Sequence, residues 1–276
     1  MNGIQMNGIQ WWCAARGDAW TWIWTPYPGV WLAVAVAALV TWRLRGFGPG
    51  DSTPTEPWWR RVAAWAAVVL LWVTLDWPAG ALGAGYLASV HAAQYLSLAM
   101  LVPSLALLGV PTGAWERLAR RPALVRGLAV ATQPFRAMLA FTIVMVFSHQ
   151  PWLVDTLMAT PAGSFALDAS WLASGLVFWW GLCAPVPARP TFAPLLKLSY
   201  VFAGTVAHVF IGMWMLIADY PIFATYELAP PIGTMTARAD QQWAGGVFLL
   251  VGSPLVLVVM TLIFFRWIGT GEEPTG

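Results

Sequence analysis

Long apolar runs, separated by short polar or basic stretches, divide most of the chain. A helix needs about 20 mostly apolar residues to cross the ~30 Å hydrocarbon core of a bilayer. Seven segments fit this requirement: residues 28–44, 61–78, 85–109, 134–151, 164–184, 195–218 and 242–268. The pattern predicts an all-α integral membrane protein with seven transmembrane helices. It also divides the chain into a Trp-rich N-terminal segment (1–27), a transmembrane domain (28–268) and a tail (269–276).

Two of these segments contain residues that change how a helix bends or packs. Pro103 in the third segment and Pro254 in the seventh each lack a backbone N–H, so both are expected to bend their helices. Gly245 and Gly246, also in the seventh segment, are expected to let a neighbouring helix approach closely.

The composition supports a membrane protein and excludes a soluble domain. Of the 276 residues, 59% are hydrophobic and 9% are charged, with a mean hydropathy of +0.66, whereas soluble domains are about 25% charged. The 20 tryptophans suit the interfaces between membrane and water, where amphipathic rings settle. The lipid bilayer is therefore an expected partner, and nucleic acid is not.

The basic residues predict the orientation in the membrane. The loops after the first, third and fifth segments, together with the tail, contain 12 of the 14 Lys and Arg residues: Arg43, Arg45, Arg60, Arg61, Arg117, Arg120, Arg121, Arg126, Arg136, Arg189, Lys197 and Arg266. Only Arg16 and Arg238 fall on the other side. Because Lys and Arg are in excess in cytoplasmic loops, the chain is predicted to be N-out and C-in.

Two further segments are expected to lie along the membrane surfaces. Between Trp115 and Pro134, the sequence WERLARRPALVRGLAVATQP alternates basic and apolar residues at helical spacing. This predicts one amphipathic helix on the cytoplasmic surface, with its arginines toward the lipid headgroups. The Trp-dense sequence WWCAARGDAWTWIWTPYPG near the N-terminus is expected to lie at the outer interface.

The predicted topology gathers candidate metal ligands in the outer half of the membrane. Met145 and His149 share one helical face at i,i+4, and His91 can approach them if the third and fourth segments are neighbours. Thioethers favour Cu(I), and imidazole binds either oxidation state of copper, so these three residues form a candidate copper site. His208 is placed near mid-depth. The alternative stays open that these histidines only hydrogen-bond neighbouring helices and that the methionine only packs.

Nothing in the sequence points to an enzyme. It contains no haem-attachment CxxCH, GxGxxG, P-loop or HExxH motif, and no segment combines a serine, a histidine and an acid in a way that suggests nucleophilic catalysis. A small-solute channel or transporter is a third possibility. However, the seven segments show no inverted repeat, and the cytoplasmic half is almost wholly apolar.

Five stretches carry a resemblance to a known family. They are SVHAAQYLSLAMLVPSLALLG, SHQPWLVDTL, SWLASGLVFWWGL, LSYVFAGTVAHVFIGMWMLIADYPIF and ADQQWAGGVF, and they lie between Tyr86 and Ile268. In this region the chain resembles the CtaG-type cytochrome c oxidase assembly factors, a bacterial seven-helix family linked to formation of the copper centre. The resemblance implies oxidase subunits as partners and the bacterial plasma membrane as the location.

The chain departs from the family at several histidine positions. The family pattern has two histidines four residues apart in the third span, whereas here Tyr95 follows His91. His149 matches the histidine of the fourth span. A second pair, at the start of the fifth span, corresponds here to Ser164 and Asp168. Asp168 is a harder oxygen ligand than histidine, and it is the candidate to assist or replace the missing imidazoles.

Two hypotheses follow from the resemblance and these departures. In the first, the chain is an assembly factor that assists copper delivery to a haem-copper oxidase on the outer face, using His91, His149, Met145 and Asp168. In the second, it has lost its ligands and is a structural or accessory subunit of a respiratory or other electron-transfer complex. The two hypotheses differ in whether contact with the complex is transient or permanent.

Overall fold

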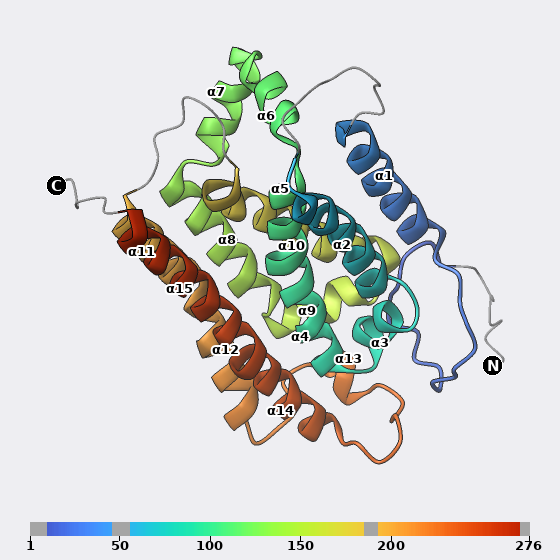
Figure 1. The fold of residues 1–276 in the computed structure, drawn as a ribbon. Helices are drawn as coiled ribbons and strands as arrows, with labels where there is room; N and C mark the ends of the chain where they lie inside the picture. The colour runs from blue at the N-terminus through green and yellow to red at the C-terminus, as the bar shows by residue number, and fades with distance from the viewer. Residues whose placement is uncertain (1–9, 46–55, 185–192, 271–276) are drawn as a thin grey trace.

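The computed structural model describes residues 10–45, 56–184 and 193–270, which contain α- and π-helices and no strand. The first half contains α1 (Pro28–Arg45), α2 (Trp58–Leu75), α3 (Ala79–Gly85), α4 (Ala88–Leu96), η1 (Ser97–Leu101), α5 (Val102–Gly109), α6 (Thr112–Ala119) and α7 (Pro122–Ala131). The second half contains α8 (Pro134–Ser148), α9 (Pro151–Met158), α10 (Pro161–Cys183), α11 (Pro194–Thr205), α12 (Ala207–Ile217), α13 (Ala224–Glu227), α14 (Ala237–Val247), η2 (Phe248–Gly252) and α15 (Ser253–Thr270). The helices form one bundle (Figure 1).

The helix lengths confirm an all-α, multi-pass membrane architecture and place the span count at six or seven. Six helical stretches among the described residues are long and apolar enough to cross a membrane: Pro28–Arg45, Trp58–Leu75, Ala88–Gly109, Pro161–Cys183, Pro194–Ile217 and Ala237–Gly269. The predicted fourth segment corresponds to α8, which has only 15 residues. Helices α7 and α8 together pass the same test but bend by 55°, so a seventh span requires counting the bent pair as one.

The predicted single amphipathic helix is instead two short helices, α6 and α7. Helix α6 ends at Ala119, and α7 begins at Pro122. Proline lacks an N–H and its ring clashes with the preceding turn, so it starts a helix well but disrupts a regular α-helix when it lies inside one. Helix α6 buries Ala114 and Trp115, whereas α7 has no buried residue.

The two prolines predicted to bend their helices each follow a π-helical turn. In η1 the Val102 N–H bonds to the Ser97 carbonyl, and in η2 the Ser253 N–H bonds to the Phe248 carbonyl. Pro103 and Pro254 come directly after these turns. A π turn widens the helix by one residue, which accommodates the proline ring without ending the helix.

Gly245, but not Gly246, lies at a close helix crossing. A Cβ atom on Gly245 would lie 2.6 Å from the carbonyl oxygen of Gly212 in α12, whereas a Cβ atom on Gly246 would meet nothing within 4 Å. The expected close approach is therefore confirmed for one of the two glycines.

Arginines fasten the helices together at one end of the bundle. Arg45 Nη2 donates to the carbonyl oxygens of Gly109 at 2.6 Å and Arg60 at 2.8 Å, and Arg60 Nη1 donates to the Val110 carbonyl oxygen at 3.0 Å. These contacts tie α1, α2 and α5 together near α6 and α7, which lie at the top of Figure 1. We call this the arginine-rich end.

The opposite end carries α3, α13, the start of α14 and the N-terminal segment (Figure 1). Of the predicted segment 1–27, residues 1–9 lie outside the described part. Trp12 and Cys13 are buried in the core, whereas Trp22 and Trp24 are exposed. The segment is therefore partly packed into the bundle and partly presents tryptophan at the surface. The last residues of the predicted tail, 271–276, also lie outside the described part.

Candidate functional site

Two histidines far apart in sequence meet inside the bundle, at the end opposite the arginine-rich end. His91 lies in the first turn of α4, and His149 follows the last residue of α8. Their ring centroids are 6.4 Å apart, with the planes at 66°. Both side chains are buried, with 5% and 2% of their surface exposed. The structure thus brings together the two histidines that the sequence singled out.

The local chain geometry fixes the orientation of the His149 ring. Its Nδ1–H donates to the carbonyl oxygen of Met145, one turn earlier in α8, at 2.7 Å. Ser148 Oγ donates to the same carbonyl at 3.1 Å and accepts from Trp171 Nε1 at 2.8 Å. Because a carbonyl only accepts, the proton of a neutral ring lies on Nδ1 and the lone pair lies on Nε2. A backbone carbonyl bound to Nδ1 is a common arrangement for a histidine that uses Nε2 as a ligand.

Four buried polar atoms of these two histidines and the adjacent Tyr95 have no hydrogen-bond partner within the described part of the chain. They are His149 Nε2, both ring nitrogens of His91 and the hydroxyl oxygen of Tyr95, and all are buried. The Tyr95 ring lies 4.8 Å from that of His149, edge to face. An unpaired buried polar group costs about 1–3 kcal/mol, and such groups call for a water, an ion or a functional explanation. We call His91, Tyr95 and His149 the histidine cluster.

Aromatic side chains from three other elements enclose the histidine cluster. The ring of Trp171 in α10 lies 4.9 Å from His91, and that of Tyr226 in α13 lies 5.8 Å from His91. The ring of Phe248 in η2 lies 5.2 Å from His149. Aromatic walls exclude water, and electrostatic interactions strengthen in such a low-dielectric site.

The remaining predicted ligands are placed differently. Met145 is buried (1% exposed), and its backbone carbonyl oxygen accepts the hydrogen bond from His149 Nδ1. Asp168 Oδ2 accepts from Trp12 Nε1 at 2.8 Å, and Ser164 Oγ bonds to the sulfur of Met158 at 3.6 Å. No group of three or more His, Cys, Asp or Glu side chains in the described ranges is arranged to hold a metal ion. Asp168 therefore fastens the N-terminal segment to α10, and it makes no hydrogen bond to either histidine.

His208 is separate from the cluster and has partners for both ring nitrogens. Its Nδ1 bonds to the Thr205 carbonyl oxygen, and its Nε2 lies 3.3 Å from Ser253 Oγ. The contact with Ser253 holds α12 against the start of α15, which is the structural role that the sequence left open for a membrane histidine.

The conspicuous Asp-Gln-Gln sequence at the start of the last span serves the fold. Asp240 accepts from the backbone N–H groups of Ala88 at 2.5 Å and Ser89 at 3.3 Å, so it caps α4 from a distant helix. Gln241 accepts from the Ile222 N–H at 2.6 Å and donates to the Tyr220 carbonyl oxygen at 3.2 Å. Gln241 therefore holds the segment 220–222 against α14, and Asp240 holds the start of α4, which carries His91, in place. Sequence alone does not show this role, because capping normally comes from within the same turn.

Another acid at this end of the bundle, Asp155, and a cysteine of the N-terminal segment, Cys13, also have hydrogen-bond partners. Asp155 Oδ1 accepts from the backbone N–H of Thr225 at 2.8 Å, at the start of α13. Cys13 Sγ donates to the Leu75 carbonyl oxygen at 3.3 Å. Burial, reinforced by the charges of Asp168 and Asp76, raises the pKa of the Cys13 thiol well above its usual value. Cys13 is therefore a neutral thiol, and the thiolate that binds metals is disfavoured.

The fold and the histidine cluster define a multi-pass helical membrane protein with two buried, unpaired imidazoles. The chain matches the family of cytochrome c oxidase caa3 assembly factors (Caa3_CtaG) over residues 19–270, and it belongs to that family. This is a family of assembly factors and not one of catalytic enzymes. No curated protein and no solved structure matches the chain.

Proposed function

We propose that the protein holds copper transiently at the histidine cluster and assists its delivery to a haem-copper oxidase on the outer side of the bacterial plasma membrane. Membership of the oxidase assembly family supplies the context. One observation carries the proposal. His149 Nε2 bears a buried lone pair, and the His91 imidazole lies close to the His149 ring. Neither His149 Nε2 nor either ring nitrogen of His91 has a hydrogen-bond partner among the described residues.

The donor set suits a soft ion held by few ligands. Imidazole binds copper well. A metal–nitrogen bond of about 2 Å on each side of one ion is compatible with ring centroids separated by 6.4 Å. Two imidazoles make a weak site, which suits a protein that must release its cargo.

The position of the cluster supports action on the outer face. His91 lies in the first turn of the helical stretch Ala88–Gly109, whose last residue is bound by Arg45 at the arginine-rich end. The excess of basic residues at that end predicts that it is cytoplasmic. The histidine cluster would then lie in the outer half of the membrane.

The second hypothesis, a ligand-depleted accessory subunit, is favoured by a different observation. Ser164 and Asp168 replace the second histidine pair of the family pattern, and both side chains are bound elsewhere. If the cluster holds no copper, its two histidines would pack the helices, and the Trp-rich outer surface would contact the complex, since aromatic residues are enriched at interfaces.

Copper retention distinguishes the two hypotheses. The purified protein is loaded with Cu(I), passed over a competing chelator, and its copper is measured per chain. We expect about one ion on the wild-type chain and almost none on the variant with His91→Ala and His149→Ala, because the two imidazoles supply the site. His208→Ala is the matched control, since it also removes a buried histidine but should keep the copper.

Two results would contradict copper delivery. One is a wild-type chain that retains no copper. The other is a cell in which the double variant is folded and inserted, yet the oxidase contains its full copper complement. Either result would favour the accessory-subunit hypothesis.

A further inference from the structure

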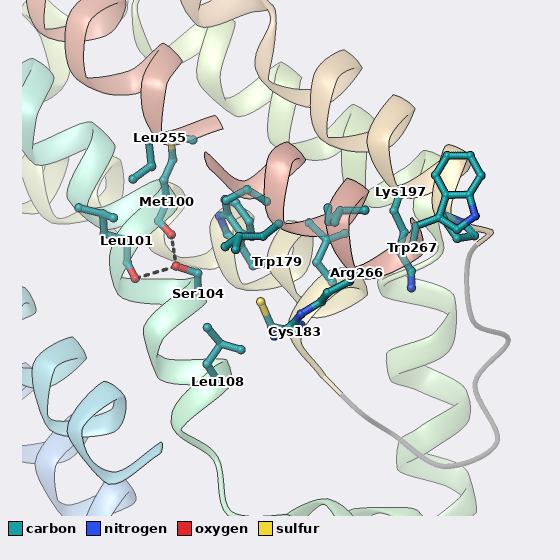
Figure 2. Close-up of a pocket in the computed structure, with 15 residues that line it drawn as sticks. Met100, Leu101, Ser104, Leu108, Trp179, Cys183, Lys197, Leu255, Arg266 and Trp267 are labelled. Carbon is teal, nitrogen blue, oxygen red and sulfur yellow. Dashed lines mark hydrogen bonds between the residues drawn. The ribbon is translucent and has the colours of Figure 1, made fainter. Parts of the chain in front are cut away.

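A cavity whose lining includes none of the histidine-cluster residues lies near the arginine-rich end. It has a volume of about 430 Å³ and is lined by η1, α5, α10, α11 and α15, which is within the ~300–1,000 Å³ range of natural ligand pockets. Helix α15 packs mainly on α11, and the cavity occupies the space between α15 and the pair α5 and α10. Figure 2 shows the side chains that line it.

The two ends of this cavity differ in chemistry. Met100, Leu101 and Leu255 line one end, and Lys197 and Arg266 lie toward the other (Figure 2). Ser104 does not add polarity to the apolar end, because its hydroxyl group bonds to the carbonyl oxygens of Met100 at 2.7 Å and Leu101 at 3.0 Å. The cavity is therefore an apolar slot that leads to two positive charges.

The two cations are not neutralised by the rest of the described chain. Lys197 lies in the first turn of α11, and Arg266 lies near the end of α15. The ion pairs among the described residues are Arg45–Glu56 and Arg238–Asp219, so neither cation takes part in one. No Asp or Glu of the described ranges lines the cavity. A ligand with an anionic group can therefore approach both cations without meeting a carboxylate from this part of the chain.

We propose that this cavity binds one anionic phospholipid, with an acyl chain between α15 and α5 and with the phosphate beside Lys197 and Arg266. The apolar slot opens within the membrane-spanning part of the bundle, where hydrocarbon is the available filling. An empty apolar space of this size would leave its walls without packing partners. Basic pockets between transmembrane helices are known sites for anionic headgroups. The lipid would join α15 to α5 and α10, and the site is independent of the proposed copper function.

Lipid-dependent thermal unfolding of the delipidated protein tests the proposal. Phosphatidylglycerol is expected to raise the melting temperature by several degrees, and phosphatidylcholine with the same acyl chains should have little effect. The variant with Lys197→Gln and Arg266→Gln should bind phosphatidylglycerol about tenfold to thirtyfold more weakly, because each cation near a membrane surface attracts anionic lipid.

Two further variants separate the cavity from general surface charge. Arg61→Gln with Arg126→Gln removes the same number of cations at other basic positions and should keep the full shift. Leu255→Trp fills the apolar slot, so it should reduce phosphatidylglycerol binding while both cations remain. Native mass spectrometry should count one retained phosphatidylglycerol on the wild-type chain and none on Leu255→Trp.

Three outcomes would overturn the proposal. The first is an equal shift with phosphatidylcholine. The second is an unchanged shift in the variant with Lys197→Gln and Arg266→Gln. The third is an equal shift with soluble glycerol 3-phosphate, which would mean that the cations bind phosphate alone and that the slot holds no acyl chain.

Discussion

The chemistry of the histidine cluster depends on which side-chain atoms already have partners. His149 is held by a backbone carbonyl within its own helix, so its orientation is set before any ligand arrives. His91 and Tyr95 have no such bond, and their polar atoms lie against aromatic walls. The cluster therefore combines one oriented imidazole with two groups that a ligand would have to satisfy.

Replacing Tyr95 tests this description directly. Tyr95→His would place a third imidazole where the present ring lies 4.8 Å from that of His149, and we expect Cu(I) affinity to rise at least about tenfold, or roughly 1.4 kcal/mol. Tyr95→Phe removes only the unpaired hydroxyl group. It should leave copper retention unchanged and keep or raise the melting temperature, because a buried unsatisfied group is lost. Competition with a chromogenic Cu(I) chelator measures both variants.

Loss of copper in Tyr95→Phe would contradict this description, because it would make the hydroxyl group a ligand. An unchanged affinity in a correctly folded Tyr95→His protein would also count against a metal at this position.

Sequence reasoning located the histidine pair but not its surroundings. Topology predicted that His91 and His149 lie at the same end of their spans. In the structure these spans both pack against α10 rather than mainly against each other. The fate of Asp168 could not be predicted in this way, because its partner Trp12 is 156 positions away in the chain. Whether a buried polar atom has a hydrogen-bond partner likewise depends on the packing of the whole bundle, so local sequence does not predict it.

At the scale of helices, apolar length predicted the spans well, and helix breaks within them poorly. Pro103 and Pro254 were expected to bend their helices, and the structure shows a π turn just before each proline. The surface helix was expected to be continuous, but Pro122 divides it. Hydrophobic periodicity indicates which face of a helix is apolar. It does not show where a helix breaks, because a break depends on individual backbone hydrogen bonds.

The crossing of α12 and α14 gives a matched pair of substitutions. Gly245→Ala would bring a methyl group to 2.6 Å from the Gly212 carbonyl oxygen, so we expect a loss of about 1–3 kcal/mol from overpacking. Gly246→Ala meets open space and should be neutral or stabilising by about 0.5–1 kcal/mol, since glycine weakens a helix interior. Thermal unfolding in detergent compares the two, and equal melting temperatures would show that this crossing is not close.

At the scale of the whole molecule, the helices at the periphery of the bundle leave broad apolar faces uncovered. Only 6% of the most apolar window of α1 is buried, and the corresponding value for Ala237–Gly269 is 17%. The inner stretch Ala88–Gly109, which carries His91 and Tyr95, is 61% buried by the same measure. The peripheral helices are therefore the surfaces that lipid or a partner complex can reach.

The amount of oxidase subunit that co-purifies with the chain distinguishes a transient assembly factor from a permanent subunit. We expect purification from native membranes in mild detergent to recover the chain alone or with less than one equivalent of unassembled oxidase subunits, because a delivery factor must dissociate. Quantitative mass spectrometry measures these ratios. Recovery at one to one with a complete respiratory complex would instead support an accessory subunit.

Helix α1 is fastened by hydrogen bonds near both ends. Trp31 Nε1 donates to Asp76 Oδ2 at 3.1 Å near its start, and Arg45 binds Gly109 and Arg60 at its last residue. Its 18 residues rise about 27 Å, slightly less than the ~30 Å hydrocarbon core of a typical bilayer. Tilting would only shorten the distance that such a helix spans, so the surrounding lipid must adapt. The protein should therefore thin the bilayer beside α1 and lose stability in thicker membranes, at a fraction of a kcal/mol per Å of hydrophobic mismatch.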